Sequence, residues 1–229
     1  MKANHILLVA LSAVTILACD TKPKGEKAHI TKDEAVSDIP HIKTEDVQTY
    51  KIDTSQSLVY WEGSKPTGTH NGIVKIEDGE FGVLNGQLVN GKVVIDMTTI
   101  ENHDLEGEWK AKLENHLRSE DFFEVDKYPR ASFITHKITP LTNDQDGATH
   151  EVTGTLIVKG ISKPIKFKVK FHCQNNICTI ESLPFIIDRT EFGIKYKSKK
   201  FFDNLKDKFI DDEIGLRFKV VGTIAEKVQ

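Results

Sequence analysis

Two of the three cysteines, Cys173 and Cys178, stand on either side of an Asn175-Asn176 turn signal. If these asparagines form a two-residue hairpin turn, the cysteines face each other as a non-hydrogen-bonded pair. Their Cα atoms would lie roughly 4.5 to 5.5 Å apart, within the range of about 4.4 to 6.8 Å that disulfides span. The spacing favours a disulfide over two free thiols. A metal site that adds His172 is a third alternative, but the spacing matches no common zinc pattern.

The third cysteine, Cys19, follows an apolar run over residues 6–18. Thirteen residues at about 1.5 Å each cannot cross a hydrocarbon core about 30 Å thick, so the run predicts a secretory signal peptide over residues 1–18. Ala18 before the cysteine resembles the lipobox of bacterial lipoproteins, although Ile16 replaces the usual leucine. We expect Cys19 to carry acyl chains such as palmitate that anchor the chain in the cell envelope, on the periplasmic or surface side. A plain signal peptide with a chance cysteine is the alternative.

Residues 19–46 are polar, contain Pro23 and Pro40, and have no apolar period. Such a segment buries too little apolar surface to offset the entropy of ordering it. The sequence therefore predicts a flexible polar linker over residues 19–46, followed by a folded domain over residues 47–226.

The remaining polar residues form no pattern typical of catalysis. His70, His103 and His116 lie in separate segments without a His-Glu-x-x-His motif, and no serine stands in a Gly-x-Ser-x-Gly context. With 31 basic and 34 acidic residues, the net charge of −3 gives no basic excess for nucleic acid. We expect no enzyme, no metal site, no cofactor and no nucleic-acid partner. A homodimer is compatible with the sequence.

The folded domain consists mostly of predicted strands. Residues 165–171 alternate apolar residues with Lys166, Lys168 and Lys170, and residues 214–220 alternate in the same way. Weaker alternation occurs at residues 50–53, 58–61, 73–76, 93–97, 131–138 and 152–158, with turn signals between the runs. About eight short strands, each with one polar face, favour an antiparallel barrel or sandwich.

One segment has helical spacing instead. Leu105, Trp109, Leu113 and Leu117 stand four residues apart, with charged residues between them. We expect a short helix that caps one end of the barrel or packs beside it. Trp109 is interpreted as a packing residue rather than a ligand contact.

A series of short stretches spans the folded domain in a characteristic order: residues 50–53 with Ser57, 68–72, 94–97 with Ile100, 121–123, 127–129 with Phe133, 152–156, 159–164 and 188–193. Through these stretches, from Tyr50 to about residue 224, the chain is similar to the YceI-like family of polyisoprenoid-binding, lipocalin-like proteins. The resemblance implies a mainly β fold, an antiparallel eight-stranded barrel that holds a long isoprenoid chain in its lumen. The chain departs from the family at the lipobox, the linker, the cysteine pair and residues 199–205.

Alternation and resemblance together predict the ligand and its wall. A hydrocarbon ligand, such as a polyisoprenoid or an isoprenoid quinone-like lipid, needs no directional partner, and each buried CH₂ contributes about 0.8 kcal/mol. The alternative is a barrel filled by its own side chains, in a non-catalytic envelope interaction or stress protein. The candidates for the inner wall are Val74, Ile76, Val93, Ile95, Met97, Phe133, Leu156, Val158, Ile165, Phe167, Val169, Phe171, Leu216 and Phe218.

Arg189 is the candidate for binding a head group at the mouth of the barrel. A guanidinium fork suits phosphate oxygens, so it would fit a diphosphate. The alternative is that Arg189 closes a local ion pair or braces a loop.

Overall fold

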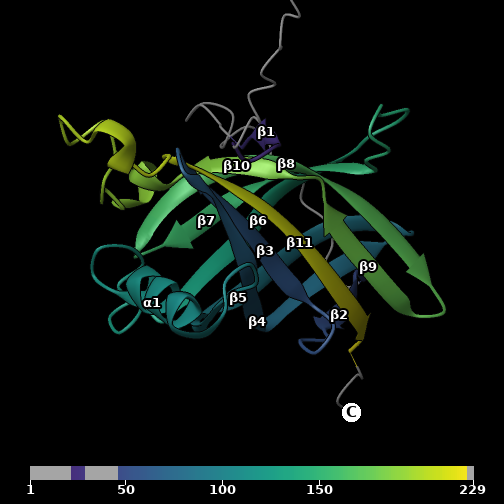
Figure 1. The fold of residues 1–229 in the computed structure, drawn as a ribbon. Coiled ribbons are helices and arrows are strands. Elements are labelled where there is room, and N and C mark those ends of the chain that lie inside the picture. The colour runs from purple at the N-terminus through teal and green to yellow at the C-terminus, as the bar shows by residue number, and fades with distance from the viewer. Residues whose placement is uncertain (1–21, 29–45, 226–229) are drawn as a thin grey trace, which may run out of the picture.

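The computed structural model describes residues 22–28 and 46–225. The predicted signal peptide, Cys19 and most of the predicted linker lie outside these residues. Within them the chain forms eleven strands and one α-helix (Figure 1), together with two 3-10 helices that matter below. The strands are β1 (Glu26–Lys27), β2 (Gln48–Ile52), β3 (Leu58–Lys65), β4 (Gly68–Leu84), β5 (Gln87–Asn102), β6 (Arg130–Pro140), β7 (His150–Val158), β8 (Ile161–Gln174), β9 (Ile177–Ser182), β10 (Phe185–Asp188) and β11 (Glu213–Ile224); the helices are α1 (Gly107–Arg118), η2 (Arg189–Phe192) and η3 (Lys206–Lys208).

Eight of the strands close into an antiparallel ring. From β3 to β9, each strand is hydrogen-bonded to the next one along the chain. β11 pairs with both β9 and β3 and so closes the ring. β2 and β10 extend the two edges of β11 beyond these pairings. Register shifts between β4 and β5 mark bulges, which bend strands as ring closure requires. The predicted mainly β, eight-stranded antiparallel fold is confirmed.

The period-2 pattern explains which side chains point into the ring. Along β8, Ile165, Phe167 and Val169 are all buried, with 4%, 6% and 0% of their surface exposed. The alternating Lys166 and Lys168 keep part of their surface in solvent. Hydrophobic burial therefore fixes the face of this strand, because a shift of one residue would exchange the apolar and the cationic faces.

Residues 22–28 belong to the folded domain, which corrects the predicted linker boundary. β1 pairs in parallel with β10, and the Ala28 N–H donates to the Ile186 carbonyl at 2.8 Å. The Lys27 Nζ also lies 2.6 Å from the Glu213 carboxylate. The free edge of β10 supplies the backbone partners, and local sequence does not reveal such an edge.

The predicted helix forms α1, which lies at one end of the ring (Figure 1). Leu117 is buried, and the Glu114 carboxylate accepts the Asn102 N–H of β5 at 2.9 Å. Trp109 is 68% exposed, so the interpretation of this residue as a packing residue is wrong. Trp109 stands in the first turn of α1 and lines the cavity described below.

Four phenylalanines form a layer across the middle of the ring. The ring of Phe167 lies 5.2 Å from Phe133, 4.8 Å from Phe185 and 5.4 Å from Phe218, measured between ring centroids. On one side of this phenylalanine layer the interior is filled by side chains such as the fully buried Val169. The layer therefore divides the ring into a filled half and a hollow half.

Candidate functional site

The hollow half of the ring encloses a cavity of about 910 Å³. It reaches the surface at the end of the ring where α1 lies, because the exposed Trp109 is among its lining residues. This volume is at the upper end of the range of about 300 to 1,000 Å³ typical of ligand pockets. The apolar side chains that the ring strands contribute to the wall are Val59, Trp61, Val74, Ile95, Met97, Ile100, Ala131, Leu156, Val158, Ile214 and Leu216.

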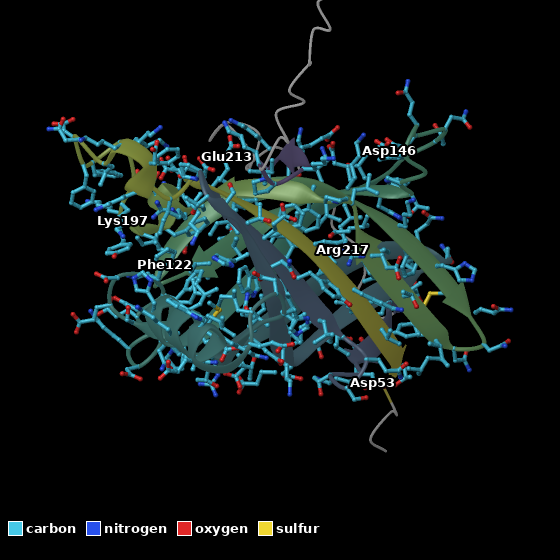
Figure 2. The ribbon with its side chains drawn as sticks, viewed as in Figure 1. Asp53, Phe122, Asp146, Lys197, Glu213 and Arg217 are labelled. Atoms are coloured by element: carbon cyan, nitrogen blue, oxygen red, sulfur yellow. A yellow bond between two sulfur atoms is a disulfide. The ribbon has the colours of Figure 1, made fainter. Side chains whose placement is uncertain are left out.

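Most polar and charged side chains of the lining stand at the opening, and the buried Ser64 and Arg189 are exceptions. Those at the opening come from α1 and the turn that follows it, from the adjacent ends of β3 and β4, and from the chain between η2 and β11. Figure 2 shows Phe122 and Lys197 at this end, away from Asp53 and Asp146. The charged and imidazole side chains that line the opening are Lys65, His70, Lys112, His116, Asp121, Lys197, Asp207 and Lys208.

The structure places the predicted wall residues in two groups. Six line the cavity: Val74, Ile95, Met97, Leu156, Val158 and Leu216. The other eight lie within the phenylalanine layer or pack elsewhere in the core: Ile76, Val93, Phe133, Ile165, Phe167, Val169, Phe171 and Phe218. Alternation identifies the inward face of a strand but carries no information on how far the cavity extends along the ring axis, so it did not separate the two groups.

Sequence reasoning missed the wall residues that come from outside the ring strands. Leu113 and Leu117 of α1 line the cavity, whereas their helical spacing predicted only a helix that caps the barrel or packs beside it. Phe122 and Phe123 also line it, from the turn that follows α1. The run of Asp121, Phe122 and Phe123 was noted in the family resemblance, which was the available signal.

Arg189 lies at the cavity wall but is committed to the protein itself. Only 1% of its surface is exposed, and it donates to the carbonyls of Asp211, Ile194 and Ile210 at 2.9–3.0 Å. Its Nη2 also lies 3.2 Å from the carboxylate of Asp212. Burial lowers the pKa of Arg189 below its ordinary value, against the opposing effect of Asp212. Arg189 thus braces the loop before β11, which is the alternative to the predicted head-group role.

Two histidines at the opening are each held by an aspartate. The His70 Nδ1 lies 2.7 Å from Asp104, and the His116 Nε2 lies 3.3 Å from Asp121. Burial alone would raise the pKa of Asp104, but hydrogen bonds from the Asn71 N–H and the His70 ring outweigh it, so this pKa lies below its ordinary value. Within residues 22–28 and 46–225, no three His, Cys, Asp or Glu side chains are arranged to hold a metal ion.

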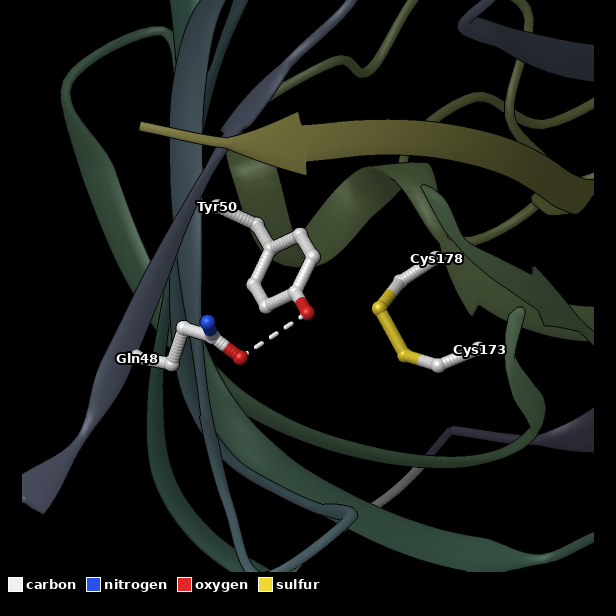
Figure 3. The surroundings of a disulfide bond; sticks show 4 residues. All are labelled: Gln48, Tyr50, Cys173 and Cys178. Carbon is white, nitrogen blue, oxygen red and sulfur yellow. Dashed lines mark hydrogen bonds between the residues drawn. A yellow bond between two sulfur atoms is a disulfide. The ribbon is translucent and has the colours of Figure 1, made fainter. Parts of the chain in front are cut away.

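Cys173 and Cys178 form a disulfide between β8 and β9 (Figure 3). They are directly opposed in the register that the Asn175-Asn176 turn predicts. The Tyr50 ring lies beside the bond, in the filled half of the ring and away from the cavity. The disulfide therefore ties the hairpin together and does not contribute to the cavity wall.

An antiparallel ring of eight strands, with an apolar cavity that opens at one end, defines a lipocalin-like fold of the kind that binds apolar molecules. The chain belongs to the YceI-like domain family, because the sequence profile of that family matches residues 50–222. This confirms the resemblance seen in the sequence.

Curated relatives match over part of their length. The chain is 32% identical to a UPF0312 protein of Pseudomonas putida strain F1 over 129 residues, which are 54% of this chain and 62% of that protein. It is 30% identical to a UPF0312 protein of Vibrio parahaemolyticus over 95 residues, 41% of this chain and 45% of that protein. The chain thus spans less than two thirds of the length of these relatives.

Two solved structures share the fold. BcnA of Burkholderia cenocepacia matches with a TM-score of 0.60 and 19% identity, over 75% of this chain and 99% of BcnA. A polyisoprenoid binding domain from Saccharophagus degradans matches with a TM-score of 0.54 and 14% identity, over 78% of this chain and 99% of that domain. At these identities the likeness shows the fold alone.

Proposed function

We propose that the protein is a membrane-anchored lipoprotein that binds a polyisoprenoid, or a similar long-chain lipid such as an isoprenoid quinone, in the cavity. The observation that carries the proposal is the distribution of polarity. Apolar side chains such as Met97, Leu156 and Leu216 line the depth, and charged side chains gather at the opening. An amphipathic molecule would place its hydrocarbon inside and its polar end at the surface.

The energetics favour a hydrocarbon chain over a polar ligand. Each CH₂ group that leaves water for the cavity contributes about 0.8 kcal/mol and needs no directional partner. The relative from Saccharophagus degradans, described as a polyisoprenoid binding domain, supports an isoprenoid in particular. The proposed role is carriage, storage or sequestration of this lipid rather than catalysis.

The anchor proposed at Cys19 would hold the ring close to the membrane. Cys19 stands only three positions before Lys22, which lies with Pro23 against β3 and β11 in a surface depression. Three positions of extended chain span at most about 11 Å. Among the described residues no helix is long and apolar enough to cross a membrane, and the proposal places the attachment at the acylated N-terminus in the bacterial envelope.

The test is native mass spectrometry of the full chain, with organic extraction of whatever copurifies. We expect one isoprenoid-type lipid bound in stoichiometric amount. A clean apo mass that does not change after incubation with isoprenoids of several lengths would contradict the proposal and favour an interaction protein without a ligand.

A matched pair of variants on β6 locates the lipid. Ala131 is 4% exposed and lines the cavity, whereas Ile134 on the opposite face of the same strand is 46% exposed. Ala131→Phe should fill the cavity and remove the bound lipid, and Ile134→Phe should leave it in place. Equal lipid content in both variants would show that the lipid binds outside the cavity.

A further inference from the structure

Residues 195–208, between η2 and β11, form a strongly basic loop that we call the lysine loop. It carries six lysines and two aspartates, a net charge of +4 in a chain whose total charge is −3. It includes residues 199–205, where the sequence departs from the family pattern. A basic segment on an otherwise acidic protein indicates an anionic partner.

The lysine loop also exposes two large aromatic side chains. Phe201 is 47% exposed and Phe202 is 49% exposed. Across the opening of the cavity, Trp109 of α1 is 68% exposed. These are half of the six large hydrophobic side chains that are exposed among residues 22–28 and 46–225. Exposed apolar groups gathered at one end of a molecule mark a site of interaction.

Trp109 and several of the basic side chains stand at the opening of the cavity, and Phe201 and Phe202 lie on the loop that carries two of these lysines. Lys197 and Lys208 of the lysine loop line the cavity, and so do Trp109 and Lys112 of α1. In Figure 1 the lysine loop, which follows η2, lies at the same end of the ring as α1. A surface that contacts the exposed aromatic rings would therefore face the cavity directly.

Most of the charges of the lysine loop are available to a partner. Lys200 forms an ion pair with Asp188. In the described part of the chain, the other five lysines of the loop form no ion pair: Lys195, Lys197, Lys199, Lys206 and Lys208.

Three of these lysines lie on aromatic rings, and the Lys197 Nζ lies 5.1 Å from the centre of the Tyr196 ring. The Lys195 Nζ lies 4.9 Å from the centre of the Phe201 ring, and the Lys199 Nζ lies 3.4 Å from that of Phe209. Lysines interleaved with aromatic side chains are typical of surfaces that lie in the interface of an anionic bilayer.

We propose that this end of the protein docks on an anionic lipid bilayer. Phe201, Phe202 and Trp109 enter the interface, the lysines contact lipid phosphates, and the cavity opens toward the hydrocarbon. Docking needs no cavity ligand. Docking would also let a lipid pass between bilayer and cavity without crossing water, and this consequence alone rests on the proposed function.

The position of β1 agrees with this orientation. β1 lies on β10, and Asp188 at the end of β10 contacts Lys200 of the lysine loop. The N-terminal segment and the lysine loop are therefore adjacent on the molecule. An N-terminal acyl anchor would hold this same end toward the membrane.

The experiment is co-sedimentation of the full chain with vesicles, with Cys19→Ser in every sample so that no acyl chain contributes. Vesicles of phosphatidylcholine alone are compared with vesicles that also contain phosphatidylglycerol. We expect binding to the anionic vesicles only. Raising the ionic strength from about 0.1 M to 1 M, which shortens the Debye length from about 10 to 3 Å, should weaken it.

Two sets of variants test the residues. Because one lysine near an anionic surface strengthens binding about fivefold, Lys199→Ala with Lys206→Ala should weaken it by about 30-fold. The matched control is Lys137→Ala with Lys170→Ala, which removes two exposed lysines on β6 and β8 and should change nothing. Phe201→Ser with Phe202→Ser should weaken binding by at least tenfold. Equal affinity of both lysine pairs, or equal binding to neutral vesicles, would overturn the proposal.

Fluorescence reports on the aromatic contact without relying on affinity. The chain has two tryptophans, and Trp61 lines the cavity wall. If Trp109 enters the interface, anionic vesicles should shift its emission to shorter wavelength, and Trp109→Phe should remove the shift. A shift that persists in Trp109→Phe would contradict the docking orientation.

Dimers in solution that bury the same face and leave no vesicle binding would instead assign the surface to a second copy. Loss of docking with the cavity lipid still bound would overturn this inference and leave the proposed function intact.

Discussion

Replacing Arg189 distinguishes a brace from a head-group ligand. The guanidinium is 1% exposed and donates to the carbonyls of Ile194, Ile210 and Asp211, with Asp212 beside it. These partners stand on both ends of the segment that carries the lysine loop. In Arg189→Met the three carbonyls lose their donor and the Asp212 carboxylate loses its cation.

The expected loss of stability is large. A hydrogen bond from a charged donor contributes about 1.5 to 3 kcal/mol, and breaking a buried ion pair by removing one partner costs about 3 to 5 kcal/mol. Since these contributions overlap, we expect Arg189→Met to lower the free energy of unfolding by about 3 to 5 kcal/mol. A domain of ordinary stability has only about 5 to 15 kcal/mol in total.

Urea denaturation of the variants measures this loss. Arg189→Met combined with Asp212→Asn should lose less than the sum of the two single variants, because the residues share one interaction. If Arg189→Met kept its unfolding midpoint but bound lipid more weakly, the brace would be refuted and Arg189 would be a head-group ligand.

Three further predictions concern the rest of the chain. Replacing Cys173 and Cys178 with Ser, which opens a loop of about six residues, should lower the free energy of unfolding by about 2 kcal/mol and leave lipid binding unchanged. Equal free energies of unfolding for the reduced and the oxidised wild-type protein would contradict this. Burial lowers the pKa of His150 below its ordinary 6.5, so its contribution to stability is complete above pH 6.5 and declines as pH falls toward the folded-state pKa. His150→Gln should therefore flatten the fall in stability below pH 6.5, and an unchanged pH profile would count against burial as the cause. In high salt, which weakens the proposed docking on anionic lipid, Cys19→Ser should move the protein from the membrane to the soluble fraction, and continued membrane association there would contradict the acyl anchor.

The sequence was sufficient for the fold because the fold depends on periodicity. The alternation of apolar residues and lysines along residues 165–171 requires a strand with one buried face, and β8 has that face. The Asn175-Asn176 turn likewise fixed the register that opposes Cys173 and Cys178. Local chemistry determined both outcomes.

The extent of the cavity depended on contacts between distant segments. Phe133, Phe167 and Phe218 have the same alternating pattern as the wall residues. Their phenyl groups, however, contact one another inside the ring of strands and separate its filled half from the cavity. Trp109 fits a helical stripe, yet the space behind it is the cavity opening. β1 forms because β10 offers a free edge. Such features become visible only once the segments are placed together.

Photo-crosslinking with an isoprenoid that carries a photoreactive group along its chain tests the central claim most directly. If the lipid occupies the hollow half, adducts should form on peptides that contain Met97, Leu156 or Leu216. They should decrease when unlabelled isoprenoid competes, and they should be absent in Ala131→Phe. Adducts confined to the outer surface, or adducts on Phe171 in the filled half, would contradict lipid binding in this cavity.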